Sequence, residues 1–419
     1  MAKYSKIGKI NDDFDVVQLK SVLVKNDAGD WGNEPDNSAI GIIRSTNFNN
    51  DGKLDLTNVA YRTLSTRKFE EKKLFASDIL VERSGGSETQ PVGRVGYITE
   101  EIAKSDFAFA NFIQRISVDE TVDSKFIYYC LQHLYEMGIT SGMQTQTTGI
   151  RNLDWKQYIG TYLPKPSLPE QASIANILSS VDEAIESVKK SIEAAEKLKK
   201  SLMQNLLTGR MKPDGTLRTE EEFYEDEKFG KVPIGWEVKK LGNLFHIKAG
   251  GDLQENFYSP IYDEQHKCPI FSNTIENSGL YGYTSNPRFI SKESLTIVGR
   301  GVGVGHVEYR KGNYDAIIRL ISLIPKQEDA IDCMYVNYYI CQYVHFAIES
   351  TGVPQLTCPK VFSTKIIIPK NVFEQSQIAE KIHCIDIDIK IKQNQIITLE
   401  RLKKSLMQNL LTGKVRVKK

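Results

Sequence analysis

A twelve-residue segment occurs twice in this chain. The sequence LKKSLMQNLLTG stands at 198–209 and again at 402–413, an offset of 204 residues in a chain of 419. At the same offset upstream, Glu170-Gln171 recurs as Glu374-Gln375. A repeat of this length, spaced by about half of the chain, predicts two similar halves.

Each copy of the repeat ends a long segment with a heptad pattern. Apolar residues recur at alternating steps of four and three, which is the a/d spacing of a coiled coil. A helix that only packs on its own domain seldom keeps this strict period for five heptads, so we expect the two helices to pair with each other. The predicted helix–helix seam comprises Ile174, Leu178, Val181, Ile185, Ile192, Leu202, Leu206, Ile378, Ile382, Ile385, Ile389, Ile396, Leu406 and Leu410.

Glycines mark the ends of these helices. Gly209 and Gly413 stand where a helix C-cap glycine belongs, and each helix is predicted to run for about 38 residues, or roughly 57 Å. An antiparallel pairing would place one globular part at each end of a rigid rod. Lys199 and Lys403 take the same seam position in the two copies. A buried polar residue there fixes the register, unless the helix ends splay and the lysines reach solvent.

Composition bounds the class of protein. A chain of 419 residues that is 40% hydrophobic can bury two well-packed domains. It has no run of eighteen apolar residues and no apolar signal segment near residue 1, so we expect a soluble, cytoplasmic protein without a membrane anchor. The six cysteines form no CxxC pair and the six histidines no HxxxH pair, which predicts reduced thiols and no zinc site.

Short β-rich runs separated by Gly and Asn predict compact α+β domains. Helices are expected near 124–137 and 330–350, and strands at 158–164 and 365–369 lead into the long helices. The predicted segments are a first domain (1–165), a central helix (166–210), a charged, extended linker (211–232), a second domain (233–370) and a C-terminal helix (371–419).

The two globular domains share short sequence motifs, which we call anchor motifs. Leu80-Val81-Glu82-Arg83 parallels Ile297-Val298-Gly299-Arg300, so Arg83 and Arg300 are predicted to be equivalent. The segments between the anchors diverge. A shared scaffold with different loops is suited to reading two different targets.

The sequence contains no recognisable nucleotide-binding or catalytic motif. The glycine run 299–305 contains no GxGxxG and is followed by strand-like residues, and no GxxxxGK[ST] or GxSxG occurs. Two similar domains, a rigid spacer and no catalytic motif favour an adaptor that positions other proteins.

Together, these features resemble the specificity subunit of type I restriction-modification systems. The resemblance covers essentially the whole chain. It is carried by the Pro-Glu-Gln-type entries into both helices (163–171 and 368–375), by the repeated Leu-Leu-Thr-Gly ends and by the Pro-Ile-Gly-Trp start at 233–236. The first domain departs from this pattern, because Asp13-Phe14-Asp15 stands where the second domain has Gly-Trp.

The resemblance implies a non-catalytic subunit with two target recognition domains, each reading one half of a bipartite site in double-stranded DNA. The helices would set the unread spacer and dock two modification subunits, which bind S-adenosylmethionine and methylate adenine. Restriction subunits that use ATP and Mg²⁺ would join them in some complexes. No cofactor is then expected in this chain.

The net charge of the two domains does not indicate a DNA-binding protein. Residues 1–165 carry 20 Lys and Arg against 22 Asp and Glu, and residues 216–370 carry 17 against 19, so each domain has a net charge near −2. Contacts to DNA must therefore come from local loops. Arg reads guanine, and Asn or Gln reads adenine.

The candidate DNA-reading residues are Arg44, Ser45, Asn47, Arg83, Ser84, Gln144, Gln146 and Arg151 in the first domain, and Ser272, Asn273, Arg300, Arg319 and Gln355 in the second. Arg83 and Arg300, if equivalent, would contact phosphates rather than bases, because a shared residue cannot explain different targets.

Two other functions remain compatible with the sequence. Near-neutral domains would suit a non-catalytic scaffold that binds proteins, and a spatially assembled active site would suit a stand-alone nuclease. Activity of the pure chain on DNA with Mg²⁺ would reveal the second.

Overall fold

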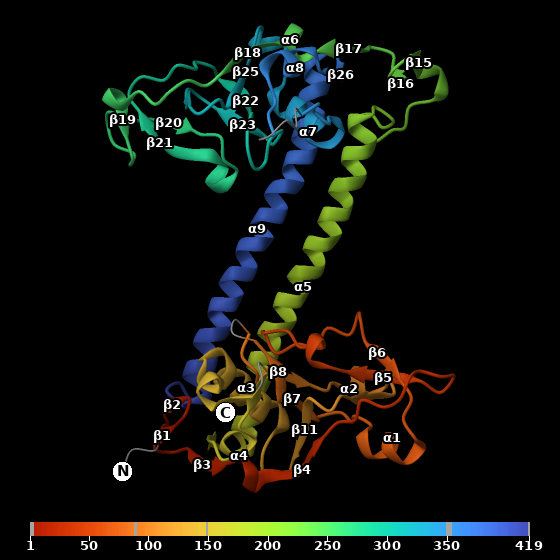
Figure 1. The fold of residues 1–419 in the computed structure, drawn as a ribbon, viewed down its shortest axis with the longest axis vertical. Helices are drawn as coiled ribbons and strands as arrows, with labels where there is room; N and C mark the ends of the chain where they lie inside the picture. Colours follow the sequence, from red (N-terminus) through yellow and green to blue (C-terminus); the bar gives the residue numbers. More distant parts are fainter. Residues whose placement is uncertain (1–3, 88–89, 148–149, 349–353, 418–419) are drawn as a thin grey trace. The chain divides into compact units, whose positions relative to one another are not determined.

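The computed structural model describes residues 4–87, 90–147, 150–348 and 354–417. The chain forms two compact units. Unit 1 consists of Met1–Lys189 with Asn394–Lys419, and unit 2 of Lys190–Gln393. The long helices α5 (Leu168–Leu207) and α9 (Val372–Leu411), labelled in Figure 1, each contribute one half to unit 1 and the other half to unit 2.

Unit 1 is built on a four-stranded antiparallel sheet in the order β4-β11-β7-β9. A second sheet, β10-β5-β6, contains the parallel pair β10 and β5. The strands of unit 1 are β1 (Tyr4–Ser5), β2 (Gly8–Lys9), β3 (Asp15–Gln18), β4 (Leu23–Ala28), β5 (Ile40–Ile43), β6 (Ala60–Arg62), β7 (Ile79–Glu82), β8 (Ser84–Gly86), β9 (Val95–Tyr97), β10 (Phe107–Phe109), β11 (Ile113–Val118), β12 (Gln144–Thr147), β13 (Ile150–Leu153) and β14 (Tyr162–Lys165). Its short helices are α1 (Thr66–Lys72), α2 (Glu100–Ala103), α3 (Ser124–Glu136) and α4 (Trp155–Ile159), with 3-10 turns at Leu19–Val22, Ser45–Asn47 and Ile139–Met143.

Unit 2 repeats this plan. Its four-stranded antiparallel sheet has the order β18-β25-β22-β23, and its second sheet, β19-β21-β20-β24, contains the parallel pair β20 and β24. The strands are β15 (Phe223–Asp226), β16 (Gly230–Pro233), β17 (Trp236–Lys240), β18 (Phe245–Ala249), β19 (Tyr258–Ser259), β20 (Cys268–Phe271), β21 (Leu280–Thr284), β22 (Glu293–Ile297), β23 (Val307–Lys311), β24 (Asp315–Ala316), β25 (Ile321–Pro325) and β26 (Lys365–Pro369). The helices are α6 (Leu241–Leu244), α7 (Cys333–Tyr343) and α8 (Cys358–Ser363), with 3-10 turns at Glu220–Glu222, Glu255–Phe257, Glu276–Gly279 and Glu328–Ala330. The predicted mixture of helices and strands in both domains is confirmed.

The same glutamine joins each long helix to its domain. Gln171 accepts a hydrogen bond from the backbone N–H of Asp123 (2.8 Å) and donates one to the carbonyl of Pro166 (2.8 Å). Gln375 makes the matching bonds, at 2.8 Å each, to the N–H of Asp332 and the carbonyl of Pro369. Asp123 and Asp332 are the N-caps of α3 and α7. The repeated Glu-Gln motif therefore fixes the angle at which a long helix leaves its domain.

Within each unit, the halves of α5 and α9 pack into the domain core. Ile174 and Leu178 of α5 share one buried cluster with Met407 and Leu410 of α9 in unit 1. In unit 2, the corresponding cluster contains Met203, Leu206 and Leu207 of α5 with Ile378 and Ile382 of α9. Burial along both helices follows the heptad period, because every predicted seam residue is buried or half-buried. Leu198 and Ile391, which lie off the seam, are 52% and 60% exposed.

The seam lysines are paired with carboxylates of the opposite helix. The Lys403 ammonium lies 2.8 Å from Asp182 in unit 1, and the Lys199 ammonium lies 2.5 Å from Asp386 in unit 2. Each lysine also lies 5.9 Å from the ring centre of a domain tyrosine, Tyr129 and Tyr338 respectively. Of the two roles expected for these lysines, the structure favours fixing the register. Each ion pair joins α5 to α9 within one unit.

The start of the chain packs on the end of α9. The N–H of Asn11 donates to the carbonyl of Thr412 (2.9 Å), and its side-chain amide donates to the carbonyl of Gly413 (2.9 Å). Gly413 has a φ of +70°, and a Cβ there would lie 2.7 Å from the Phe14 ring. A glycine is required at this helix end, as the repeat predicted.

Two predicted element boundaries were wrong. The helix expected near 330–350 ends at Tyr343, and its last predicted residues, Glu349 and Ser350, lie outside the described residues. The strand expected from Tyr158 begins at Tyr162, because Asp154 caps the short helix α4 first.

The linker was also predicted incorrectly as extended and solvated. It contains the β15–β16 hairpin, and Arg218 forms an ion pair with Glu374 at 2.5 Å and lies over the Trp236 ring. A cation anchored between a carboxylate and an indole orders this segment against unit 2.

No helix among the described residues has the length and apolar character needed to cross a membrane. All six cysteines are free.

Candidate nucleic-acid interface

Two loops of unit 1 meet at one edge because their strands are parallel. β5 ends at Ile43 and is followed by Arg44–Thr46, whereas β10 ends at Phe109 and is followed by Ala110–Phe112. Parallel neighbours have their carboxyl ends at the same edge, and the N–H of Ala110 donates to the carbonyl of Ile43 at 2.9 Å. Loop residues from distant parts of the sequence therefore share one surface.

The loop from Ala110 to Ile113 is a tight, well-anchored turn. The N–H of Ile113 donates to the carbonyl of Ala110 (2.9 Å). The carbonyl of Phe112 accepts bonds from the backbone N–H groups of Arg83 (2.8 Å) and Ser84 (3.3 Å). With its backbone held in this way, the turn leaves the side chains of Asn111 and Phe112 exposed, Phe112 by 45%.

This turn separates two open cavities. One, of about 410 Å³, is lined by Trp31, Arg44, Ser45, Thr46, Ala110, Asn111 and Phe112. The other, of about 560 Å³, is lined by Arg83, Ser84, Asn111, Phe112, Thr145, Asn152, Leu153, Asp154, Trp155 and Lys156. Asn111 and Phe112 belong to both, so they form a ridge between two hollows with cationic side chains.

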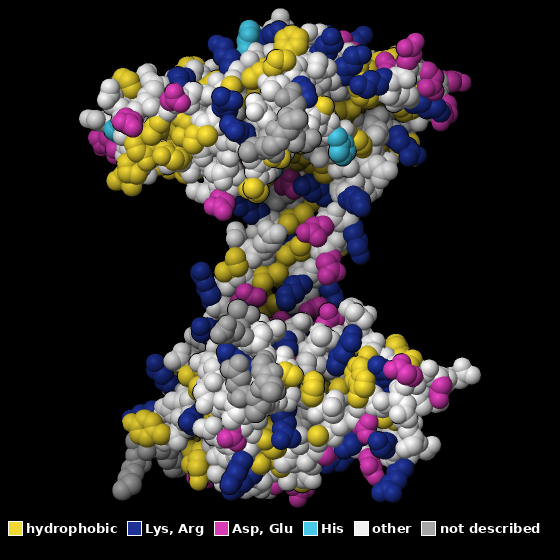
Figure 2. All heavy atoms as spheres, in the orientation of Figure 1, with side chains coloured by type: hydrophobic (Ala, Val, Ile, Leu, Met, Phe, Trp, Pro, Cys, Tyr) yellow, Lys and Arg dark blue, Asp and Glu magenta, His cyan; other side chains and the backbone are white. Residues whose placement is uncertain are grey.

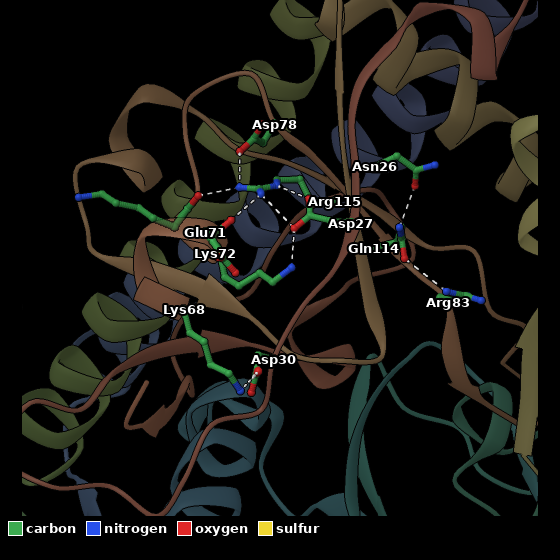
Figure 3. A network of polar contacts seen from close by, with 11 residues as sticks. Asn26, Asp27, Asp30, Lys68, Glu71, Lys72, Asp78, Arg83, Gln114 and Arg115 are labelled. Atoms are coloured by element: carbon green, nitrogen blue, oxygen red, sulfur yellow. Dashed lines mark hydrogen bonds and ion pairs between the residues drawn. The ribbon is translucent and has the colours of Figure 1, made fainter. Parts of the chain in front are cut away.

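A chain of polar side chains holds Arg83 beside this ridge (Figure 3). Nη1 of Arg83 lies 3.5 Å from Oε1 of Gln114, whose Nε2 donates to Oδ1 of Asn26 at 2.8 Å. The indole N–H of Trp155 donates to the same Asn26 oxygen at 3.1 Å. Gln114 is almost fully buried. Arg83 is thus positioned from the sheet side by amide groups, which do not neutralise its charge.

The loop that follows β5 rests on a buried ion pair. Arg94 donates to both Glu82 carboxylate oxygens at 2.8 and 2.7 Å, and to the carbonyls of Ser45 and Phe48. Burial raises the pKa of the Glu82 carboxyl, whereas the Arg94 guanidinium opposes this shift. Both side chains are nearly inaccessible, so this pair supports the loop and does not face a ligand.

The arginines of the first domain fall into two groups. Arg62, Arg67, Arg94 and Arg115 form ion pairs with carboxylates. The predicted residues Arg44, Arg83 and Arg151 form no ion pair with any described residue, and the Nε of Arg44 is buried without a hydrogen-bond partner. Figure 2 shows acidic and basic side chains mixed over the visible surface. Uncompensated cations therefore occur locally in a domain whose net charge is slightly negative.

Arg115 illustrates how acidic residues are used elsewhere. Its guanidinium donates to both oxygens of Asp27 at 2.9 and 3.1 Å, and Lys72 contacts the same carboxylate at 2.8 Å. Figure 3 shows this cluster joining α1 to the sheet. Carboxylates occupied in this way do not repel an approaching polyanion as free charges would.

Some predicted residues have structural roles. Asn47 is 2% exposed, accepts a hydrogen bond from the N–H of Arg44 and donates to two carbonyls of its own loop. The hydroxyl of Ser45 donates to the carbonyl of Ser84 (3.2 Å), and the hydroxyl of Ser84 donates to Asn152 (2.6 Å). These side chains hold the loops in place, and Asn47 in particular is withdrawn from solvent.

The hairpin β12–β13 places its predicted residues away from the second cavity. Thr145, Asn152 and Leu153 of this hairpin line the cavity, whereas Gln144 and Arg151 are not among its lining residues. The amide nitrogen of Gln144 lies 3.4 Å from the carbonyl of Thr140. The side chain of Gln146 lies outside the described residues.

Unit 2 assembles its predicted residues at the equivalent edge. The N–H of Gly299 donates to Oδ1 of Asn273 (2.8 Å), and the amide of Asn273 donates to the carbonyl of Arg300. Arg300 forms an isolated β-bridge with Gln355. Ser272 is buried and hydrogen-bonded to Gly279, so it is structural. Arg300 and Arg319 are exposed and form no ion pair with a described residue.

The predicted equivalence of Arg83 and Arg300 is wrong by one residue. The N–H of Leu153 donates to the carbonyl of Arg83, and the N–H of Leu356 donates to the carbonyl of Gly299. Arg83 therefore corresponds to Gly299. Because a shift of one residue in a strand moves a side chain to the other face, the two arginines need not share a function.

Sequence reasoning also missed residues of this surface. Asn111, Phe112, Thr145, Asn152 and Lys156 line the cavities, yet none belongs to an anchor motif. The sequence signal for this surface is a polar residue followed by an aromatic residue, Asn111 and Phe112, in the short gap between two strands.

Comparison with known proteins identifies the family. Residues 11–197 and 233–401 match the family model described as type I restriction modification DNA specificity domain. The chain belongs to this family. It is accordingly a DNA specificity subunit, the non-catalytic component of a type I restriction-modification system.

Relatives support this assignment over nearly the full length. The subunit is 26% identical over 431 residues to the putative type I restriction enzyme MjaX specificity subunit of Methanocaldococcus jannaschii, covering 99% of this chain and 97% of the relative. It is 27% identical over 342 residues to the MjaVIII specificity subunit of the same organism, covering 76% of each.

A solved structure shares the fold. The crystal structure of the type I restriction-modification S subunit from M. genitalium superposes with a TM-score of 0.60 at 17% identity, covering 98% of this chain and 99% of that one. The resemblance derived from the repeat and the helix entries is confirmed.

Proposed function

We propose that each domain of this specificity subunit reads one half of a bipartite site in double-stranded DNA. The observation that supports this most directly is the common scaffold with different loops at the same edge. β5 and β10 in unit 1, like β20 and β24 in unit 2, are parallel pairs whose carboxyl ends carry the unpaired arginines and exposed polar residues. Side chains on such loops can reach base edges and phosphates.

We further propose that α5 and α9 form one antiparallel coiled coil that sets the unread spacer. Both helices contain 40 residues, which corresponds to about 60 Å, or about 18 base pairs of B-DNA. The ion pairs of Lys199 and Lys403 support a single register, because both link α5 to α9 with the same spacing.

Membership of the family supports a proposal about partners. We propose that two modification subunits dock on the subunit and supply S-adenosylmethionine and the adenine methyltransferase activity, and that restriction subunits, where present, supply ATP- and Mg²⁺-dependent steps. The chain itself is proposed to bind no cofactor and to act in the cytoplasm.

Insertion of one heptad into each helix tests the spacer. Seven residues added after Val188 and after Lys392 lengthen each helix by about 10.5 Å while keeping the seam spacing. We expect the recognised motif to keep both half-sites and to gain about three unread base pairs. Sequencing of methylated adenines in cells that carry the variant and its modification subunit measures this directly.

The control is the same insertion in the β15–β16 turn, between Asp226 and Gly230, which leaves both helices unchanged. It should leave the spacer unchanged. An unaltered spacer in the helix variant, with methylation still present, would refute the role of the helices as a ruler.

A further inference from the structure

The turn at 110–113 of unit 1 has a counterpart in unit 2. There, the N–H of Ile317 donates to the carbonyl of Phe271 (2.9 Å) and the N–H of Leu320 donates to the carbonyl of Ile317 (3.1 Å). These bonds repeat those made by Ala110 and Ile113. Each turn connects the end of the parallel pair to a central strand of the antiparallel sheet. The two residues at its tip are Asn111 and Phe112 in unit 1, and Ile318 and Arg319 in unit 2.

The tip in unit 2 has an unfavourable backbone for its residues. Ile318 and Arg319 have φ values of +54° and +62°. Turns with two successive left-handed residues strongly prefer Gly, Asn or Asp, and a β-branched residue is the least suited to them. Ile318 is nevertheless 60% exposed, so burial of its side chain does not compensate for the strain.

The surroundings hold this turn in place. A Cβ at Gly299 would lie 2.6 Å from the carbonyl oxygen of Arg319, so the glycine admits the close approach of the turn. The N–H of Ile318 donates to the carbonyl of Gly251 at 3.1 Å. A strained, exposed and externally fixed pair of residues is typical of functional sites.

Both tips combine the same two chemistries. Each presents one apolar side chain, Phe112 or Ile318, next to one hydrogen-bonding side chain, Asn111 or Arg319. Asn makes paired hydrogen bonds with adenine, Arg makes them with guanine, and an apolar side chain contacts the methyl group of thymine. The order of the two chemistries is reversed between the units, as expected if the tips read different bases.

Building on the proposed function, we propose that these two turns are base-reading tips that enter the DNA groove. Asn111 and Phe112 contact bases of one half-site, and Ile318 and Arg319 contact bases of the other. The unpaired cations beside the tips, such as Arg44 and Arg83, bind the flanking phosphates and position them.

The test measures the methylation motif of the complete complex. Phe112→Ala and Ile318→Asn are each combined with the modification subunits, and methylated adenines are sequenced genome-wide. We expect Phe112→Ala to relax the base preference at one or two positions of one half-site by about tenfold, with the other half-site unchanged. Ile318→Asn should relax the opposite half-site only.

Matched controls separate reading from folding. Phe75 is 47% exposed, against 45% for Phe112, and Ile234 is 64% exposed, against 60% for Ile318. Phe75→Ala and Ile234→Asn should leave every base preference unchanged. Asn tolerates the left-handed backbone, so Ile318→Asn should not lower the thermal unfolding midpoint, and any loss of specificity is then not a loss of fold.

The outcomes distinguish a wrong assignment of the tips from a wrong proposed function. A wild-type complex that methylates a bipartite motif, with both tip variants keeping its preferences or losing methylation uniformly at all sites, overturns the assignment of the tips alone. A wild-type complex without a bipartite motif overturns the proposed function as well.

Discussion

Single residues with the same role in the two halves have unequal surroundings. The side chains of Lys403 and Asp182 are 8% and 17% exposed, whereas those of Lys199 and Asp386 are 29% and 32% exposed. The ion pairs occupy equivalent positions of the repeat. Their contributions to stability should therefore differ, because removing one partner of a buried pair leaves a desolvated charge, whereas an exposed charge is solvated.

We predict that Asp182→Ala lowers the free energy of unfolding by about 2–4 kcal/mol, against about 1 kcal/mol or less for Asp386→Ala. Urea denaturation of the full chain, followed by circular dichroism, measures both. Adding Lys403→Met to Asp182→Ala should restore much of the loss, since it removes the buried charge. Equal losses for the two aspartate variants would show that burial does not govern these pairs.

A buried histidine gives the fold a pH dependence. His133 is 3% exposed, and neither ring nitrogen has a hydrogen-bond partner among the described residues. Burial lowers the pKa of His133 to about 4, and the positive charge of Lys404 adds to this shift. The folded protein thus keeps the ring neutral while the unfolded chain binds a proton below its ordinary pKa of about 6.5.

We predict that stability falls as the pH is lowered from about 6.5 towards 4, by about 2 kcal/mol at pH 5 from this group alone. Above pH 6.5 both states are neutral at this position, so the contribution is constant. Urea denaturation of wild type and His133→Leu across this range measures the effect. The variant should show a shallower decline, and identical pH profiles would exclude His133 as its source.

Elements were predictable where a local signal dominates. The heptad period and the terminal glycines predict the positions of α5 and α9, because these patterns act within a few turns of chain. The C-terminal helix was expected over 371–419, but α9 ends at Leu411, just before the cap glycine Gly413. The end of α7 and the start of β14 were misplaced. These boundaries depend on caps and on packing against distant strands, which periodicity does not encode.

Among the loops, the segment after β5 depends most on one side chain. Arg94 links Glu82 to the carbonyls of Ser45 and Phe48, and no sequence motif pointed to it. It was not predictable because its partners lie 12 to 49 residues away in the chain. The ordered loop carries Arg44, so support from Arg94 is required for the proposed interface.

We predict that Arg94→Ala lowers the free energy of unfolding of unit 1 by about 3–5 kcal/mol, because it leaves Glu82 buried without its cation. Hydrogen exchange should accelerate at residues 45–55. Arg67→Ala serves as a control, since Arg67 and its partner Glu71 are largely exposed and the expected change is below about 1 kcal/mol. Unchanged exchange in the loop would show that other contacts suffice to order it.

For the whole molecule, the near-zero net charge of +1 conceals a local imbalance. Carboxylates near the first sheet are engaged with cations, as Asp27 is with Arg115 and Lys72, while the arginines beside the turn tips form no ion pair with described residues. The affinity for DNA should then depend on few phosphate contacts. The slope of the binding constant against salt concentration, both on logarithmic scales, gives the number of these contacts.

We predict that Arg83→Ala reduces the slope of log K against log salt concentration by about 0.9 for each phosphate that this arginine neutralises. Arg62→Ala, which removes an arginine already paired with Glu34, should leave the slope unchanged. Binding isotherms of the assembled complex at several salt concentrations measure both. An equal change in the two variants would contradict a special role for the unpaired cations.

The architecture of the site was only partly predictable. Arg44, Arg83, Arg300 and Arg319 were selected from the sequence and lie on the surface now proposed. Asn47 and Ser272 were selected for their chemistry but are buried, and the turn tips were missed apart from Arg319. Which side chain of a loop faces solvent is decided by strand pairing between distant segments, and a single sequence does not reveal that pairing.

The glutamine joint at the base of each long helix has an evolutionary consequence. Gln171 and Gln375 form hydrogen bonds with backbone atoms of the cap and the helix entry, so these bonds do not depend on the side chains of the recognition domain. Recombination between such genes within the sequences that encode the long helices would exchange one recognition domain for another and keep these hydrogen bonds. New target preferences would then arise by shuffling whole modules rather than by slow point mutation.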